Sequence, residues 1–200
     1  MTDIFEELNR DIAKPMRKRV NAQDKLEAAV DLWTFAVRLY DEPEVATACL
    51  ALQEDAGIDV PVLLFGAWLG MEKGVVLDAA RLAMVEAAVG EWHGQVVQTL
   101  RALRRQLKRE PHPAPSESTD RLRERIKASE LEAERIELAE LARLFEEWPT
   151  TGNGNVARAT ANMQLVIASP KMTETARLGP LIAALEKMGG FKRKSRRERR

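Results

Sequence analysis

Apolar side chains recur every three or four residues along the first long stretch of the chain. The stripe is formed by Leu26, Val30, Trp33, Val37 and Tyr40. This spacing places all five on one face of an α-helix over about residues 23–40. The apolar residues that widen the stripe are Leu32, Phe35, Ala36 and Leu39. Because so broad an apolar face must be covered, we predict that this helix is buried centrally in the domain.

Helical patterns continue along most of the remaining chain. Ala, Leu, Glu and Arg, which are strong helix formers, dominate the sequence, and aromatic residues make up only 5% of it. Runs of β-branched and aromatic residues, which are typical of strands, are absent from the sequence. We predict further helices over about residues 44–55, 61–70, 76–109, 118–148, 156–168 and 173–187.

Glycines add detail to this outline. The segment 61–70 is apolar nearly all round, which predicts a helix inside the domain. Gly66 and Gly70 would let a neighbouring backbone approach that helix closely. Gly90 and Gly94 fall within the pattern over 76–109, where we expect a kink or a break.

The predicted architecture is a single all-α domain of about six to eight helices over residues 22–190. Its parts are a compact core over 22–90, a longer antiparallel hairpin over 91–148, and C-terminal helices over 156–188 that pack on the hairpin. An N-terminal arm, 1–21, precedes the domain. A disordered basic tail, 191–200, is expected to leave it at Gly189 and Gly190.

Several features favour a cytoplasmic protein without membrane contact. Cys49 is the single cysteine, which excludes an intrachain disulfide and fits a reducing compartment. The acidic N-terminus lacks the apolar segment of a signal peptide. The longest apolar stretch, 60–71, contains Pro61 and is too short to span a bilayer.

The charge of the chain is unevenly distributed, although its net value is zero. The last ten residues carry seven Lys and Arg and one Glu, a net charge of +6, which leaves −6 on residues 1–190. Such a basic cluster attracts phosphates, so nucleic acid is a possible partner of the tail. The residues that would contact phosphate or an acidic partner are Lys192, Arg193, Lys194, Arg196, Arg197, Arg199 and Arg200. A solubilising tail that pairs with the acidic body is the alternative.

Three blocks in one register resemble a known family. They comprise Leu32, Trp33, Phe35, Ala36 and Tyr40; Pro43, Val45, Ala48, Cys49, Leu50, Leu52 and Gln53; and Gly57, Asp59, Val60, Leu63, Leu64, Phe65, Trp68, Leu69 and Gly70. Two weaker blocks follow at Leu100–Lys108 and Ile126–Glu134. The pattern is similar to an all-helical proteobacterial family of domains of unknown function, over roughly residues 28–145. The resemblance implies one bacterial helical domain and carries no catalytic residue.

The candidate reactive side chains each have a simpler structural interpretation. His93 could act as a base or a ligand, but the second histidine, His112, lies in a Pro-rich loop, so we expect a structural or exposed role. Cys49 has apolar neighbours and is expected to be a buried, inert thiol. Asp59 could contact a ligand, but capping of the helix that follows explains it.

Acidic residues also recur along the helix over 118–148. They are Glu130, Glu134, Glu137 and Glu140. Paired carboxylates can hold metal ions in helical bundles, but such sites need Glu-x-x-His motifs, which are absent. We therefore expect a solvated face whose partners are Arg123, Arg135 and Arg143. The sequence predicts no catalytic, cofactor or metal site.

These observations favour a non-enzymatic module that binds another protein. The reasons are that no set of catalytic residues is found in the sequence, that the predicted hairpin is long and charged, and that an arm and a basic tail are expected at the two ends. One alternative is a nucleic-acid-associated protein that uses the basic tail. The other is an apolar small-molecule binder or enzyme with a pocket near Trp33, Tyr40, Phe65 and Trp68.

Overall fold

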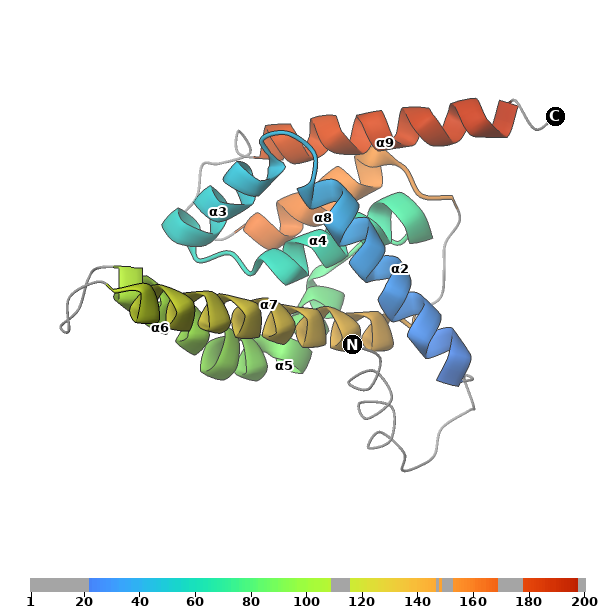
Figure 1. The fold of residues 1–200 in the computed structure, drawn as a ribbon. Helices are drawn as coiled ribbons and strands as arrows, with labels where there is room; N and C mark the ends of the chain where they lie inside the picture. Colours follow the sequence, from blue (N-terminus) through green and yellow to red (C-terminus); the bar gives the residue numbers. More distant parts are fainter. Residues whose placement is uncertain (1–21, 109–115, 147, 149–152, 169–177, 198–200) are drawn as a thin grey trace.

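The computed structural model describes residues 22–108, 116–146, 148, 153–168 and 178–197, so the arm predicted over 1–21 lies outside the described part. Within these ranges every regular element is a helix, which confirms the predicted all-α fold (Figure 1). The elements are α2 (Ala22–Tyr40), α3 (Val45–Ala56), α4 (Val60–Trp68), η1 (Leu69–Lys73), α5 (Ala79–Trp92), η2 (His93–Val97), α6 (Gln98–Lys108), α7 (Glu117–Phe145), α8 (Val156–Ile167) and α9 (Gly179–Arg197). None of the described helices combines the length and the apolarity needed to cross a membrane.

Helix α4 lies at the centre of the fold. Every residue from Val60 to Trp68 is buried, as the all-round apolar sequence predicts. Asp59 caps the helix, because its Oδ1 accepts a hydrogen bond from Val62 N at 3.2 Å. Helices α2, α7 and α8 pack around α4, and the π-helical turn η1 continues it (Figure 1).

The C-terminal helices cover the core rather than the hairpin. α8 packs on α4 and η1, and α9 packs on α3 and α8. Gly70 allows the approach of α8, since a Cβ atom at this position would lie 2.2 Å from Ala159 N. The predicted close approach at Gly70 is therefore confirmed, whereas the predicted packing of these helices on the hairpin is wrong. Backbone contact at Gly70 therefore fixes where α8 packs.

A buried amide joins α8 to the core. Asn162 has no solvent exposure, and its Oδ1 accepts a hydrogen bond from Leu77 N at 2.8 Å. Its Nδ2 donates to Gly66 O at 3.0 Å and to Val75 O at 2.9 Å. One side chain thus binds three backbone groups, of which Leu77 N and Val75 O lie in the segment after η1 and Gly66 O lies in α4.

Helix α9 extends beyond the predicted end of the domain. It continues through Gly189 and Gly190 to Arg197, so the chain does not leave the helix at the two glycines as expected. Each glycine costs a helix about 1 kcal/mol, which the helix-forming Lys and Arg residues that follow can offset. Basic residues also suit the C-terminal end of a helix dipole. The side chains of residues 190–200 lie outside the described part.

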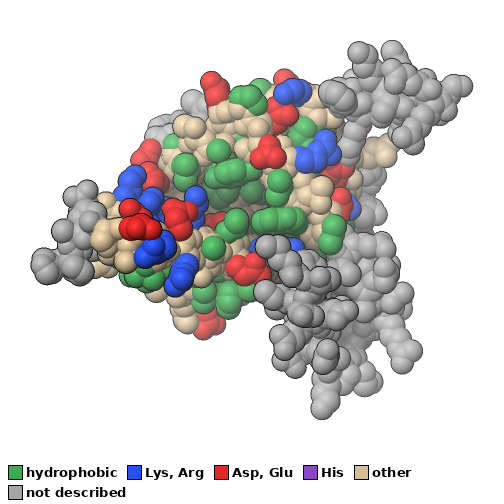
Figure 2. Space-filling model, in the orientation of Figure 1, with side chains coloured by type: hydrophobic (Ala, Val, Ile, Leu, Met, Phe, Trp, Pro, Cys, Tyr) green, Lys and Arg blue, Asp and Glu red, His purple; other side chains and the backbone are tan. Residues whose placement is uncertain are grey.

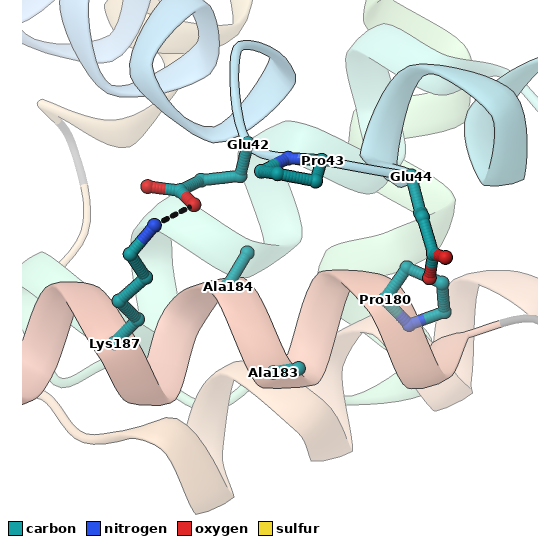
Figure 3. Close-up of a pocket in the computed structure, with 7 residues that line it drawn as sticks. All are labelled: Glu42, Pro43, Glu44, Pro180, Ala183, Ala184 and Lys187. Carbon is teal, nitrogen blue, oxygen red and sulfur yellow. Dashed lines mark hydrogen bonds and ion pairs between the residues drawn. The ribbon is translucent and has the colours of Figure 1, made fainter.

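The start of α9 is tied to the turn between α2 and α3. A shallow groove at this junction is lined by Glu42, Pro43, Glu44, Pro180, Ala183, Ala184 and Lys187 (Figure 3). Lys187 Nζ lies 2.5 Å from Glu42 Oε2 across the groove, so both charges are already paired. The groove therefore reflects the packing of α9 against the turn between α2 and α3.

Helix α2 turns its predicted stripe outward. Its core face is formed by Leu32, Phe35, Ala36 and Leu39, all of which are buried. Val30, Val37 and Tyr40 are 50%, 39% and 36% exposed. The predicted central burial is confirmed for the four residues that widen the stripe and is wrong for Val30, Val37 and Tyr40, because the apolar face of α2 is broader than the area that meets the core.

The predicted antiparallel hairpin is confirmed, with a longer first arm. α5, η2 and α6 form one continuous rod from Ala79 to Lys108, and α7 packs along it. The kink expected between Gly90 and Gly94 takes the form of the π-helical turn η2. Helix α7 begins after Ser116, which forms a capping box with Thr119. Because α7 also packs on α2 and α4, it belongs to the core as well as to the hairpin.

Candidate functional site

A four-residue repeat faces α7 along the first arm of the hairpin. Its members are Val85, Val89, His93, Val97 and Arg101. Each four-residue step turns about 40° too far around an ideal α-helix, so a repeat of this length would drift off one face. The wide turn η2, which begins at His93, takes up that drift. All members except the half-buried His93 are buried.

His93 meets two carboxylates from different elements. Its Nδ1 lies 3.0 Å from Asp59 Oδ2 and 3.2 Å from Glu137 Oε2. Asp59 precedes α4 and keeps Oδ2 free for this contact because Oδ1 caps the helix. One possible ligand atom from each residue lies within 4.8 Å of the others, so the three could hold a metal ion. We call Asp59, His93 and Glu137 the His93 triad.

The two carboxylates change the protonation of the triad. Burial lowers the pKa of His93, but hydrogen bonds and charge from Asp59 and Glu137 outweigh it and raise the pKa to about 9. Burial and the nearby Asp59 raise the pKa of Glu137 to about 8, against the effect of its hydrogen bond to His93. The triad therefore retains protons at neutral pH that isolated groups would have lost.

Neighbouring groups fix the orientation of His93. The side-chain amide of Gln98 pairs with His93 Nε2 at 2.8 Å, and its two ends allow it to donate or to accept. Trp92, the residue before His93, donates from Nε1 to Ala133 O at 3.0 Å. Two adjacent residues thus hold η2 against one turn of α7, from Ala133 to Glu137.

A second charged cluster lies further along the same interface. Arg101 donates from Nε to Glu130 Oε1 at 2.9 Å and from Nη2 to Glu134 Oε1 at 2.6 Å. Arg104 also binds Glu130, through Nη2 at 3.2 Å. Burial opposes ionisation of Glu130, but hydrogen bonds from Arg104 and Arg101 hold the pKa of this carboxyl below its usual value. The cluster joins α6 to α7 by ion pairs that are largely withdrawn from water.

The predicted solvated acidic face is therefore wrong for part of α7. Glu130 and Glu137 are only 6% and 1% exposed, and their partners lie on the opposite arm of the hairpin. Glu140 matches the prediction, because it is paired with Arg143 at the surface. Arg101 and Arg104 are paired with Glu130 across the hairpin, so an acid of α7 neutralises part of the basic face of α6.

Cys49 is buried, as predicted. Burial raises the pKa of its thiol to about 12, which removes the thiolate at neutral pH. Burial, with the charges of Cys49 and Glu134, likewise raises the pKa of Tyr40 to about 12. Neither residue is suited to act as a nucleophile or a base here.

The outward face of α2 forms an apolar surface. Val30, Trp33, Val37 and Tyr40 follow one another at helical spacing and are exposed or half-buried. Figure 2 shows apolar side chains gathered across this face of the molecule, over α2 and towards α3 and α7. The guanidinium of Arg135 lies over the Trp33 ring, 5.1 Å from its centroid, and joins the surface to α7. We call these four residues of α2 the α2 face.

The four aromatic residues proposed to line a pocket fall into two environments. Phe65 and Trp68 have no solvent exposure and pack against each other, with ring centroids 6.0 Å apart. Trp33 and Tyr40 belong to the α2 face. Phe65 and Trp68 therefore serve the core, and an apolar ligand site stays a prediction.

Sequence reasoning missed the His93 triad because its members lie far apart in the chain. A usable signal existed in the four-residue repeat that includes His93, since an ideal α-helix cannot keep such a repeat on one face. The basic residues expected to bind phosphate have side chains outside the described part, and so does His112.

The fold and the site together define an all-α protein with a charged, buried helix interface and an exposed apolar helix face. The chain belongs to the family described as Protein of unknown function (DUF2390), whose family model matches residues 31–141. The match includes the His93 triad and nearly all of the α2 face, whereas α8 and α9 lie beyond it. Neither the curated proteins nor the solved structures yielded a match.

Proposed function

We propose that the protein is a non-enzymatic interaction module that binds an amphipathic helix of a partner protein on the α2 face. The observation that carries the proposal is the exposure of Val30, Val37 and Tyr40 on a helix whose other face already fills the core. Single exposed apolar residues are ordinary, but a row at helical spacing is typical of a docking surface.

The dimensions of the α2 face support a helical occupant. Val30 to Tyr40 spans ten residue steps, or about 15 Å at 1.5 Å per residue. Three turns of a partner helix would cover this length with apolar residues at i, i+3 and i+7. The Trp33 ring gives the surface a large aromatic side chain of the kind that often dominates binding energy.

Charge indicates how the partner helix is oriented. Asp41 lies one turn after Val37, and its backbone nitrogen continues the helix by donating to Val37 O at 2.9 Å. Asp41 follows Tyr40 in the chain and is exposed. We therefore expect a basic residue of the partner at this end of the α2 face.

A charge placed in the α2 face tests this proposal. Full-length wild type, Val37→Asp and the control Met84→Asp are used to capture partners from the native host's lysate after nuclease treatment. Met84 is a matched control because it is 48% exposed on α5. The apolar stretch of a captured protein is then made as a peptide, and its affinity for each variant is measured.

The expected result is a peptide that is helical when bound and loses at least about tenfold in affinity with Val37→Asp, equivalent to 1.4 kcal/mol, but not with Met84→Asp. Equal binding by both variants would overturn the proposal. Partners that disappear with nuclease treatment or with deletion of residues 191–200 would support the nucleic-acid alternative instead. If the captured protein is a second copy of this chain, the α2 face mediates self-association and the proposal of a different partner protein is overturned.

A further inference from the structure

We propose that Asp59, His93 and Glu137 bind one divalent transition-metal ion, with Zn²⁺ as the best match to the three donor atoms. The proposal goes beyond partner binding, because the triad lies at the junction of α4, η2 and α7 and shares no residue with the α2 face. It rests on how the three side chains converge and on an unsatisfied buried oxygen.

The spacing of the donor atoms fits a shared cation. Asp59 Oδ2 and Glu137 Oε2 lie 3.0 and 3.2 Å from His93 Nδ1, and the three residues offer atoms within 4.8 Å of one another. Ligand atoms about 2.1 Å from a tetrahedral zinc ion are themselves ~3.4 Å apart, a few tenths of an ångström more than the two distances from His93 Nδ1. An ion beside the three atoms would therefore need only small movements of the side chains. The remaining positions around it would be open to water.

Glu137 gives the second, independent observation. Its side chain has no solvent exposure, and Oε1 of its carboxylate has no hydrogen-bond partner. A buried carboxylate oxygen without a donor is costly, and it is placed beside a second carboxylate, that of Asp59. A divalent cation that displaces the protons held by the triad and binds both carboxylate oxygens of Glu137 would satisfy Oε1 and balance the charge of the two acids.

The surrounding groups match those of metal sites. A histidine that binds a metal through one nitrogen normally forms a hydrogen bond through the other, and His93 Nε2 has Gln98 as its partner. When Nδ1 binds the ion, Nε2 carries the proton and the Gln98 amide presents Oε1 after a half-turn. Asp59 is held by the bond between Oδ1 and Val62 N, which leaves Oδ2 available.

The donor set selects the kind of metal. One imidazole nitrogen with two carboxylate oxygens suits Zn²⁺ and other divalent transition metals. Mg²⁺ and Ca²⁺ prefer sites built from oxygen alone. We therefore expect Zn²⁺ to bind more tightly than either.

Two helix caps provide a matched pair of variants. Asp59→Asn keeps the cap of α4 but weakens a ligand, whereas Asp78→Asn changes the equivalent cap of α5, where Asp78 Oδ1 accepts from Arg81 N at 2.8 Å. The untagged full chain is titrated calorimetrically with Zn²⁺. We expect one ion per chain, affinity at least about tenfold lower for Asp59→Asn and for Glu137→Gln, and no change for Asp78→Asn or His112→Ala. Equal affinity for the Asp59 and Asp78 variants, or loss with His112→Ala, would overturn the proposal.

A measurement on the wild type does not depend on how the variants fold. Co²⁺ is titrated into the unmodified chain, and its visible absorption is recorded. Saturation at one equivalent, reversed by Zn²⁺, is the expected result. An absorption spectrum identical to that of Co²⁺ in buffer would overturn the proposal.

Discussion

Gly70 and Ala159 bring two helical segments into direct backbone contact. A Cβ atom on Gly70 would lie 2.2 Å from Ala159 N and 2.4 Å from Ala159 Cα. The hydrogen bond from Asn155 N to Gly70 O, at 3.0 Å, fixes the same approach. The position of α8 thus depends on the absence of a side chain at Gly70.

Substitution of Gly70 tests this contact. We expect Gly70→Ala to lower the free energy of unfolding by about 3 kcal/mol or more, because backbone must move to admit the methyl group. Gly90→Ala is the control, since Gly90 is helical and has no atom within 4 Å of its added Cβ. It should stabilise the protein by up to about 1 kcal/mol. Chemical denaturation measures both, and equal effects would contradict the close approach.

Asn162 provides a second test of the core. Asn162→Ala removes the side-chain partner of Leu77 N and of Val75 O, and one of the hydrogen bonds to Gly66 O, in a buried region. We expect a loss of roughly 3 kcal/mol, from the cost of unsatisfied buried polar groups. Asn153→Ala, at an exposed position, should change stability by less than about 0.5 kcal/mol. A similarly small loss for Asn162→Ala would show that the three backbone groups have other partners.

Ionisation of Glu130 makes the free energy of unfolding depend on pH. Its pKa is lowered in the folded chain, chiefly because Arg104 and Arg101 outweigh the burial that opposes ionisation. The stabilisation is therefore complete above the unfolded pKa, near 4.3, and is lost as the pH falls through the folded pKa. Glu130→Gln should cost roughly 2 kcal/mol at pH 7, and the difference should narrow below about pH 4.5.

Glu140→Gln is the matched control for that experiment. Its partner Arg143 is exposed, so the change should cost less than about 0.5 kcal/mol at pH 7. Urea denaturation across the pH range compares the two variants with the wild type. If the difference in free energy of unfolding between Glu130→Gln and the wild type stays constant as the pH falls below about 4.5, the assigned ion pairs are contradicted.

Cys49 should be unreactive in the folded protein. Burial raises the pKa of the thiol to about 12, and the side chain has no solvent exposure. Labelling with a thiol reagent at pH 8 should therefore require unfolding, and its rate should rise with denaturant across the unfolding transition. Rapid labelling without denaturant would place the thiol at the surface.

The helices were largely predictable from the sequence, but their faces were not. The segment from Val60 to Trp68 is apolar all round, so its burial needed no knowledge of its neighbours. For α2 the periodicity indicated one broad apolar face, and only the packing against α4 and α7 decides which part of it is covered. The same limit applies to α7, where Glu137 follows the acidic pattern of its helix but faces His93.

The candidate site depends on contacts between distant parts of the chain. Asp59 was correctly predicted as a helix cap, yet its second carboxylate oxygen meets a residue 34 positions away. His93 was considered as a base or a ligand but expected to be structural or exposed, because its partners were sought among histidines rather than among acids on another helix. Such long-range pairings follow from how the hairpin packs on the core.

The most direct test of the central claim is site-specific photo-crosslinking from the α2 face in the native host. A photoreactive residue replaces Val37 in the full chain, and the control carries it at Met84. We expect one defined product from position 37, with the crosslinked peptide lying in an amphipathic helix of another protein, and no such product from position 84. The same products from both positions, or none from position 37, would contradict the assignment of the α2 face as the surface that binds a partner.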